Sequence, residues 1–323
     1  MVDWVFVLTP LLVLPIVLLF RFVGCGTQLD VDPELPTVSY RDYIMGELKG
    51  PVLVPFPTAA PKPGAPDVIA YWRLVETGSA ATDEKGVHNG EYREGQSVND
   101  IAPTTVDAGS DAAPGTFDAN QPSLVVSDKV ATCRTFFGGY VFVPFDPNAT
   151  TKLYTDEFTI EAWVDTRWTP KPGYDHTLFS AGGHYVAPYD TTPAFHGFEV
   201  LATHVDGLDR WQVRLHPHVG DVFPPRLPIV PRGAATHVAV TVEKDGVTKK
   251  VRLFVNGGVA AIATVGFYSL PDGAPLYIGI WGAPQPVNPP VLRKPILSKI
   301  QEVVLHRTAL SEQEIKNHFD IRY

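Results

Sequence analysis

Short apolar runs separated by chain-breaking residues make up most of this chain, and this pattern limits its possible folds more than any other feature. The 323 residues include 31 prolines and 27 glycines. Long packed helices are excluded, because proline removes a backbone donor and glycine carries a high entropic cost in a helix. From residue 68 onward, runs rich in β-branched residues alternate with turn residues, at 68–74, 140–144, 158–164, 198–202, 211–215, 237–242, 251–255 and 260–265. This pattern predicts an all-β sandwich or jelly roll.

Local turn and cap signals agree with this prediction. Asn256 and Gly257 lie between two of the runs and predict a type I′ hairpin, because both residues tolerate positive φ. Near the end of the chain, Ser311 and Glu314 have the spacing of a capping box and predict the start of a closing helix.

The first 25 residues predict a single-pass membrane anchor. Residues 4–20 carry no charge, and a helix of this length spans about 25 Å, close to the hydrocarbon thickness of a bilayer. Trp4, at the start of this segment, suits the membrane interface. Arg21 follows Phe20 at its other end and can extend to the headgroups.

Other fates of this segment remain open. The acidic start, Met-Val-Asp, is unlike the basic start of a cleaved secretory signal. Residues 22–25 are similar to a lipobox, which would make Cys25 a lipidation site. Arg21 follows the apolar run and, by the positive-inside rule, weighs against export of the rest of the chain.

Composition separates a linker from the globular part. Residues 26–66 are rich in proline, above all at 51–66, and are expected to form an extended, semi-rigid linker. Within it, residues 40–48 suit either a short helix or a docking patch. Residues 67–323 then form the predicted β-sandwich.

Charge and motifs exclude several function classes. The net charge of −9, without a Lys/Arg-rich run, argues against nucleic-acid binding. Cys25 and Cys133 are too few for a disulfide framework or a four-cysteine zinc site. P-loop, Rossmann, nucleophile-elbow and zincin motifs are all absent from the sequence.

Four segments, in the right order, resemble one family. They are 70–74 with the loop at 83–92, then 158–164, 251–257 and 299–315. They are similar to the laminin G-like (LamG) branch of the concanavalin A-like lectin/glucanase superfamily, which is common in bacterial surface proteins. The chain departs from the pattern at Gln301, where the family usually has an acidic residue. The resemblance implies a concanavalin A-like jelly-roll β-sandwich outside the cytoplasm, in the periplasm or extracellular space. It leaves function open, because the fold carries enzymes, lectins, adhesion modules and scaffolds.

The acidic residues do not form a catalytic pattern. A retaining glucanase needs two carboxylates about 5–5.5 Å apart, and the acid ladder that marks glucanases of this fold is missing. Glu161 and Asp165 are four residues apart, and Glu199 stands alone in the sequence. Trp72 and Trp163 alternate with polar neighbours and are expected to fill the inter-sheet core. Glu161 points to the opposite side from Ile160 and is expected to be a solvated strand residue. We therefore expect no catalytic residues and no enzyme activity.

Metal sites are only weakly indicated. His216 and His218 flank a proline, so in an extended chain both point the same way and could bind a transition metal. Solvent-facing or hydrogen-bonded loop histidines are the simpler interpretation. Calcium is the habitual ion of the family, and its oxygen ligands could come from two groups of loop residues: Asp107, Asp111, Asp118, Asn120 and Asp128, or Asp206 and Asp209.

Aromatic residues are concentrated between residues 168 and 223. Tyr174, Tyr185, Tyr189 and Trp211 form the candidate interaction surface, suited to a protein or a glycan. Taken together, the sequence predicts a non-catalytic, membrane-anchored binding domain, most simply an accessory or scaffolding subunit that contacts other membrane proteins. A carbohydrate-binding or adhesion module at the cell surface is the alternative, followed by a glycoside hydrolase.

Overall fold

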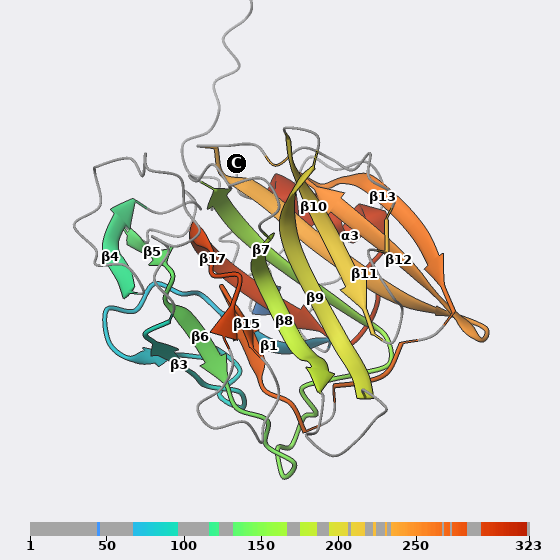
Figure 1. Cartoon of the computed structure of the whole chain (residues 1–323), viewed down its shortest axis with the longest axis horizontal. Helices are drawn as coiled ribbons and strands as arrows, with labels where there is room; N and C mark the ends of the chain where they lie inside the picture. Colours follow the sequence, from blue (N-terminus) through green and yellow to red (C-terminus); the bar gives the residue numbers. More distant parts are fainter. Residues whose placement is uncertain are drawn as a thin grey trace, which may run out of the picture. The chain divides into compact units, whose positions relative to one another are not determined.

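The computed structural model describes the residues that carry most of the predicted strands (Figure 1). They are 44–45, 67–95, 116–122, 132–166, 175–185, 194–205, 208–216, 222–223, 230, 234–266, 268–271, 273–282 and 292–321. All of them belong to one compact unit, Val38–Tyr323.

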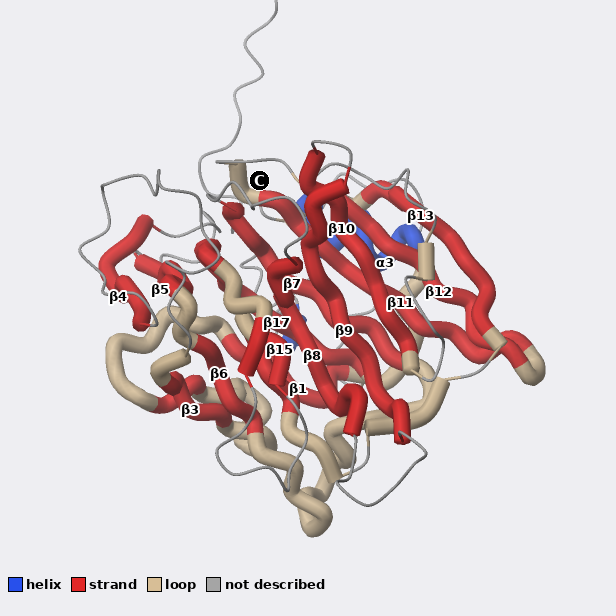
Figure 2. Tube along the Cα trace, viewed as in Figure 1, coloured by secondary structure: helices blue, strands red, loops and turns tan. Residues whose placement is uncertain are grey.

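Two antiparallel sheets lie one over the other, as predicted, and strands dominate the described chain (Figure 2). The eight-stranded sheet has the order β13-β12-β11-β7-β17-β5-β4, with β1 also paired to β17. Its strands are β1 (Val68–Trp72), β4 (Thr116–Pro122), β5 (Thr132–Phe137), β7 (Phe158–Thr166), β11 (Thr236–Asp245), β12 (Thr248–Val255), β13 (Gly258–Val265) and β17 (Leu297–His306).

The second sheet has seven strands in the order β10-β9-β8-β14-β6-β3-β2. They are β2 (Ala80–Ala81), β3 (Gly90–Arg93), β6 (Tyr140–Val143), β8 (Asp175–Tyr185), β9 (Ala194–Val205), β10 (Leu208–Leu215) and β14 (Leu276–Ile278). A separate short pair, β15 (Trp281–Gly282) and β16 (Leu292–Arg293), precedes β17 in the chain.

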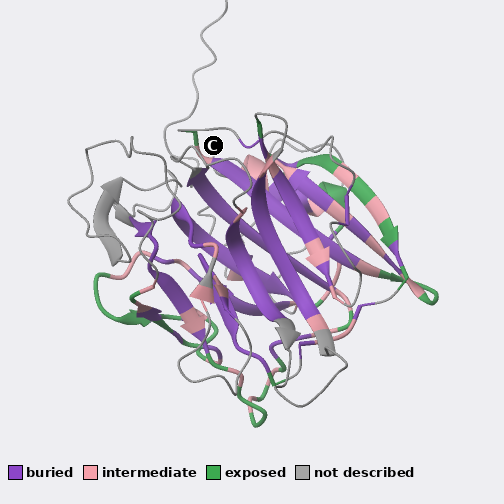
Figure 3. Ribbon diagram, viewed as in Figure 1, coloured by how far each residue is buried: buried purple, intermediate pink, exposed green. Residues whose placement is uncertain are grey.

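The main hydrophobic core fills the space between the two sheets. Phe158 of β7 meets Phe198 of β9 with ring centroids 4.9 Å apart. Trp72 lies in this core, as expected. Trp163 is fully buried but belongs to a different cluster, with Tyr71 and Val304, on the outer face of the eight-stranded sheet. Figure 3 shows buried residues along most of the central strands of both layers.

The loop after β1 is organised by one buried carboxylate. Asp83 accepts hydrogen bonds from four backbone N–H groups, those of Tyr71, Lys85, Val87 and His88, at 2.8–3.0 Å. The opening segment that carries part of the family resemblance is therefore a structural loop held by Asp83.

The predicted hairpin and helix are both confirmed. Asn256 and Gly257 have φ values of 51° and 74°, as a type I′ turn requires. Helix α3 (Glu312–Asp320) begins with the Ser311–Glu314 capping box. Leu310 and Ile315 pack on Ala239 and Phe254, so α3 covers part of the outer face of the eight-stranded sheet.

The predicted anchor (1–25) and most of the predicted linker (26–66) lie outside the described residues. Within that linker, Ile44 and Met45 are helical, and Ile44 is buried against Val68, Tyr71 and Trp163. The described residues include no helix with the length and apolar character needed to cross a bilayer.

Candidate functional site

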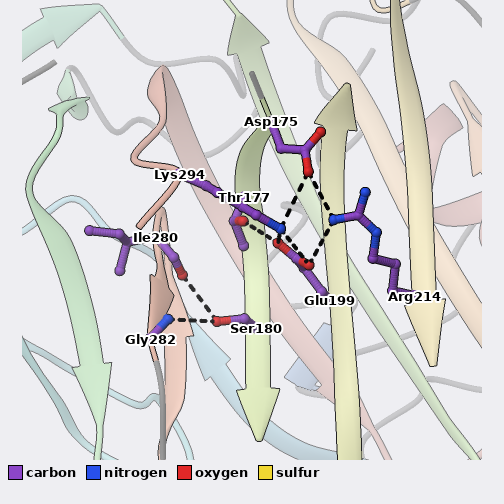
Figure 4. A network of polar contacts seen from close by, with 8 residues as sticks. All are labelled: Asp175, Thr177, Ser180, Glu199, Arg214, Ile280, Gly282 and Lys294. Atoms are coloured by element: carbon purple, nitrogen blue, oxygen red, sulfur yellow. Dashed lines mark hydrogen bonds and ion pairs between the residues drawn. The ribbon is translucent and has the colours of Figure 1, made fainter. Parts of the chain in front are cut away.

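A network of charged side chains lies on the outer face of the seven-stranded sheet. In β9, Glu199 alternates with the core residues Phe198 and Val200, so its carboxylate points away from the inter-sheet core. Strand pairing places Ser180 of β8 and Arg214 of β10 opposite Glu199. Figure 4 shows how Asp175, Thr177, Arg214 and Lys294 gather around this carboxylate.

Two cations bridge the two carboxylates of this network. Arg214 Nη1 lies 2.9 Å from Asp175 Oδ2 and 3.3 Å from Glu199 Oε2. Lys294 Nζ lies 3.3 Å from Asp175 Oδ2 and 3.0 Å from Glu199 Oε1. Thr177 Oγ1 also donates to Glu199 Oε1 at 2.6 Å. Glu199 is thus part of a four-charge network, which corrects the expectation that it stands alone.

The electrostatics of this network favour an ionised Asp175. Burial raises the pKa of Asp175, but the charges of Arg214 and Lys294 and hydrogen bonds from Arg214 and Thr203 outweigh it, so its pKa is lowered. A general acid needs a carboxyl group that is protonated near the working pH. Asp175 has the opposite environment, and the adjacent Glu199 carboxylate faces the same two cations.

Strand β15, which pairs with β16 directly before Lys294, is held on the same face of the sheet. Ser180 Oγ donates to Ile280 O at 3.1 Å and accepts from Gly282 N at 3.4 Å (Figure 4). Gly282 lies against the ring of Tyr277, where an added Cβ would come within 2.4 Å of a ring atom. Only glycine allows this approach of β15 to the sheet.

Aromatic side chains occupy the neighbouring part of this face. Tyr140, Phe142 and Tyr277 form one cluster, and the Arg93 guanidinium lies 3.8 Å from the ring centroid of Phe142. Burial, followed by the proximity of Tyr140, raises the pKa of Tyr277 to about 12. Tyr140 is 4% exposed and Tyr277 1% exposed, so neither presents an open ring face.

Strand β13 forms one edge of the eight-stranded sheet, and in the described chain no strand pairs with its outer side. Its sequence, GVAAIATV, contains no charge and no proline. Val259 is 38% exposed and Ile262 is 52% exposed, and Figure 3 shows exposed residues along much of this strand.

Glu161 lies in a different environment from the one expected. Its side chain is fully buried on the outer face of the eight-stranded sheet, where His237, His306 and His318 surround it. Strand alternation gave the correct face but missed that helix α3 covers it. Burial raises the pKa of Glu161, but the charge of His318 and hydrogen bonds from the three histidines outweigh this effect and hold its pKa well below the usual value.

The structure places the four residues of the predicted interaction surface in different environments or does not describe them. Trp211 is fully buried in the inter-sheet core, so its proposed role in an exposed surface is wrong. Tyr174 and Tyr189 lie outside the described residues, and for Tyr185 the structure describes the backbone position in β8 alone.

The described residues do not test the predicted metal site at His216 and His218. His216 is half-buried at the end of β10, and His218 lies outside the described residues. Among the calcium candidates, Asp209 is buried and its Oδ1 lies 2.7 Å from His204 Nδ1. For the remaining calcium candidates, the structure describes no side-chain environment.

Asp175 and Lys294 were missed by the sequence reasoning. They are 24 and 95 residues from Glu199 along the chain. The pairing of β8 with β9 brings Asp175 close to Glu199, and the later segment that contains Lys294 passes beside the same carboxylate. The alternation of Glu199 between apolar neighbours was the available signal, because it placed a carboxylate on the outer face of a central strand.

Comparison with known proteins agrees with the fold. The family model of the concanavalin A-like lectin/glucanases superfamily, Laminin_G_3, matches residues 137–316. This match covers more than half of the chain, and the chain therefore belongs to that superfamily. No curated protein matches the chain.

Solved structures are similar to this chain at low sequence identity. A Trypanosoma rangeli sialidase in complex with 2,3-difluorosialic acid is 16% identical with a TM-score of 0.51, and the match covers 87% of this chain and 37% of that one. Domain 4 of AbnA, a GH43 extracellular arabinanase from Geobacillus stearothermophilus, in complex with arabinotriose, is 14% identical with a TM-score of 0.49, covering 78% of this chain and 98% of that one. The chain spans little more than a third of the sialidase.

Proposed function

We propose that this protein is a non-catalytic binding domain, an accessory or scaffolding subunit that contacts another protein through the open edge of the eight-stranded sheet. The observation that carries this proposal is β13, an uncharged edge strand with exposed apolar side chains. Such an edge offers unpaired backbone N–H and C=O groups to an added strand.

In the described chain, β1 pairs only with β17, and all five of its residues are buried. The other four edge strands differ in how well they are protected against pairing. Strand β2 has two residues, β4 contains Asp118 and Pro122, and β10 contains Asp209, Arg210 and Arg214. Short length, charge and proline are the usual means by which proteins prevent edge pairing. Strand β13 is eight residues long and has none of them.

The partner chemistry follows from the strand itself. An extended segment with apolar residues at alternate positions would pair with the β13 backbone and cover Ile262 on one face. An uncharged edge gives little electrostatic steering, so the contact would depend on backbone pairing and apolar burial.

The carboxylate environments support binding without turnover. Glycoside hydrolysis requires one carboxyl group to donate a proton while the other acts as base or nucleophile. Arg214 and Lys294 both contact Asp175 and Glu199, and their charges help to lower the pKa of Asp175, which makes Asp175 a poor proton donor.

The apolar segment at residues 4–20 supports a single-pass anchor for this domain. Its length fits a bilayer span, and the proline-rich residues that follow would keep the sandwich away from the headgroups. We propose that the sandwich lies on the periplasmic or extracellular side of the membrane.

Glycan binding is the alternative function. The aromatic cluster of Tyr140, Phe142 and Tyr277 beside an ionic network is typical of sugar-contacting surfaces, which combine apolar faces with polar edges. The burial of Tyr140 and Tyr277 counts against it, since stacking needs an accessible ring face.

The test is detergent extraction of the full chain from its native membrane, followed by mass spectrometry of co-purifying proteins. We expect a protein in fixed stoichiometry with the wild-type chain and its loss from Ile262→Lys, because a lysine on an edge strand opposes pairing. Val247→Lys is the matched control, since Val247 is 90% exposed in the turn between β11 and β12. This control should retain the partner.

Three results would contradict the proposal. They are equal recovery of the partner with Ile262→Lys, calcium-dependent glycan-array binding without a protein partner, and polysaccharide turnover that is abolished by Glu199→Gln. Equal recovery with Ile262→Lys would place the contact away from β13. Glycan-array binding would support the glycan alternative, and turnover would establish a hydrolase.

A further inference from the structure

A cluster of potential metal ligands lies on the other side of the sandwich from the Asp175 network. Glu161 of β7, His237 of β11, His306 of β17 and His318 of α3 converge on the outer face of the eight-stranded sheet. The side chains of Glu161, His237 and His306 are fully buried, and that of His318 is 4% exposed. Four elements thus each contribute one side chain to a sealed polar centre.

The atoms of this cluster are close enough to share an ion. Glu161 Oε1 lies 2.9 Å from His306 Nε2 and 2.7 Å from His318 Nδ1, and all three atoms lie within 4.8 Å of one another. Ligand atoms around a tetrahedral ion with bonds of about 2.0–2.1 Å are about 3.4 Å apart. The contacts of Glu161 with His306 and His318 would therefore need to widen by about 0.5 Å and about 0.7 Å, respectively.

The ligand chemistry selects the class of ion. Imidazole nitrogen favours divalent transition metals, whereas calcium and magnesium prefer sites made wholly of oxygen. We propose that Glu161, His306 and His318 bind a divalent transition-metal ion of the Zn²⁺ class.

His237 has a separate role in this site. Its Nε2 lies 3.0 Å from Glu161 Oε2, the oxygen that does not face the other two ligands. Donation from His237 to that oxygen would orient the carboxylate, as hydrogen bonds to metal-bound carboxylates commonly do. His237 is therefore a positioning residue.

The competing explanation is a carboxylate held by three N–H donors with no ion. In that arrangement, His306 Nε2 donates to Glu161 and His306 Nδ1 has no hydrogen-bond partner among the described residues. With a metal on Nε2, the proton moves to Nδ1, which changes the unpaired atom from an acceptor to a donor. The two arrangements thus leave the same atom unsatisfied, and metal content distinguishes them.

An ion here would join the C-terminal helix to the sheet. His318 lies on α3, while Glu161 and His306 lie on adjacent strands β7 and β17. The ligand side chains are almost fully buried, so the role of the ion would be structural, and ion loss would release α3.

The experiment measures bound metal in the full-length detergent-solubilised chain, purified without a polyhistidine tag. The protein is stripped with a chelator, incubated with Zn²⁺, separated from free ion and analysed for metal content. We expect about one Zn²⁺ per chain and a higher melting temperature with the ion than without it, because an ion bound to the folded state stabilises that state.

Two variants locate the site. His318→Gln should lose the bound Zn²⁺ and its effect on the melting temperature. His204→Gln is the matched control, since His204 pairs with Asp209 on the seven-stranded sheet, and this variant should retain both. Retention of Zn²⁺ by His318→Gln, or its loss from His204→Gln, would overturn the proposed site.

X-ray absorption at the zinc edge of the wild-type protein keeps the test decisive if His318→Gln does not fold. The expected spectrum contains two imidazole ligands and light oxygen ligands. The proposal is wrong if the wild-type chain binds no stoichiometric Zn²⁺, or if the bound ion has no imidazole ligand.

Discussion

At the scale of single residues, the environment of each outer-face carboxylate depends on the side chains and elements that cover it. Glu161 and Glu199 both alternate with apolar neighbours along a strand, and both point away from the inter-sheet core. Helix α3 and three histidines enclose Glu161, whereas two cations and a threonine surround Glu199. The sequence predicts the direction of each side chain, but the covering residues come from distant parts of the chain.

Removing one cation from the Asp175 network should destabilise the fold. Arg214→Met leaves Lys294 as the single cation against two largely buried carboxylates, and we expect a loss of about 2 kcal/mol in the free energy of unfolding, after discounting for partial exposure. Chemical denaturation measures this loss. Lys316→Met removes an exposed pair within helix α3 and should cost less than about 0.5 kcal/mol. Equal effects of the two variants would show that the network is not stabilising.

A buried histidine should make stability depend on pH. Burial lowers the pKa of His176 to about 4, although its Nδ1–H donates to Pro295 O at 2.7 Å. The unfolded state binds the proton below an ordinary pKa of 6.5, whereas the folded state stays neutral down to about pH 4. The free energy of unfolding should therefore fall by about 3 kcal/mol as the pH decreases from about 6.5 to about 4.

His176→Asn tests this origin of the pH dependence, since asparagine keeps a side-chain N–H donor without titrating. Urea denaturation at pH 7 and at pH 4.5 should show a clearly smaller loss of stability for the variant than for the wild type. Burial also lowers the pKa of His88, so part of the dependence should remain. An unchanged loss in His176→Asn would contradict the assignment.

At the scale of elements, local signals predict strands, turns and caps well. The Asn256-Gly257 turn and the Ser311 capping box both depend on residues adjacent in the chain, and both are confirmed. Local signals did not predict the burial of Trp211. Its position among loop-like aromatics suggested a surface, but its strand pairs with β9 and turns the ring into the core.

Asp83 should make a large contribution to the stability of the loop after β1. Asp83→Ala removes the acceptor of four backbone hydrogen bonds, and we expect a loss of about 3 kcal/mol in the free energy of unfolding, because buried N–H groups are left unpaired. Asp83→Asn keeps one side-chain oxygen and should lose less. Thermal denaturation of both variants measures the difference, and equal losses would contradict the role of the second oxygen.

At the scale of the whole molecule, the layered architecture separates three regions. The Asp175 network lies on the outer face of the seven-stranded sheet, the Glu161 cluster lies on the outer face of the eight-stranded sheet, and β13 forms an edge. The sequence predicts the sandwich and the strand that became β13. It could not show that β13 is an edge, because the order of strands in a sheet depends on long-range pairing.

Amide hydrogen exchange on the full chain, alone and with its co-purified partner, tests the central claim most directly. If β13 is the docking edge, residues 258–265 should exchange faster in the free chain and become protected in the complex, because an added strand pairs with their backbone. Unchanged exchange in β13, with new protection confined to β8, β9 and β10, would contradict the claim and place the contact on the face that carries Asp175 and Glu199.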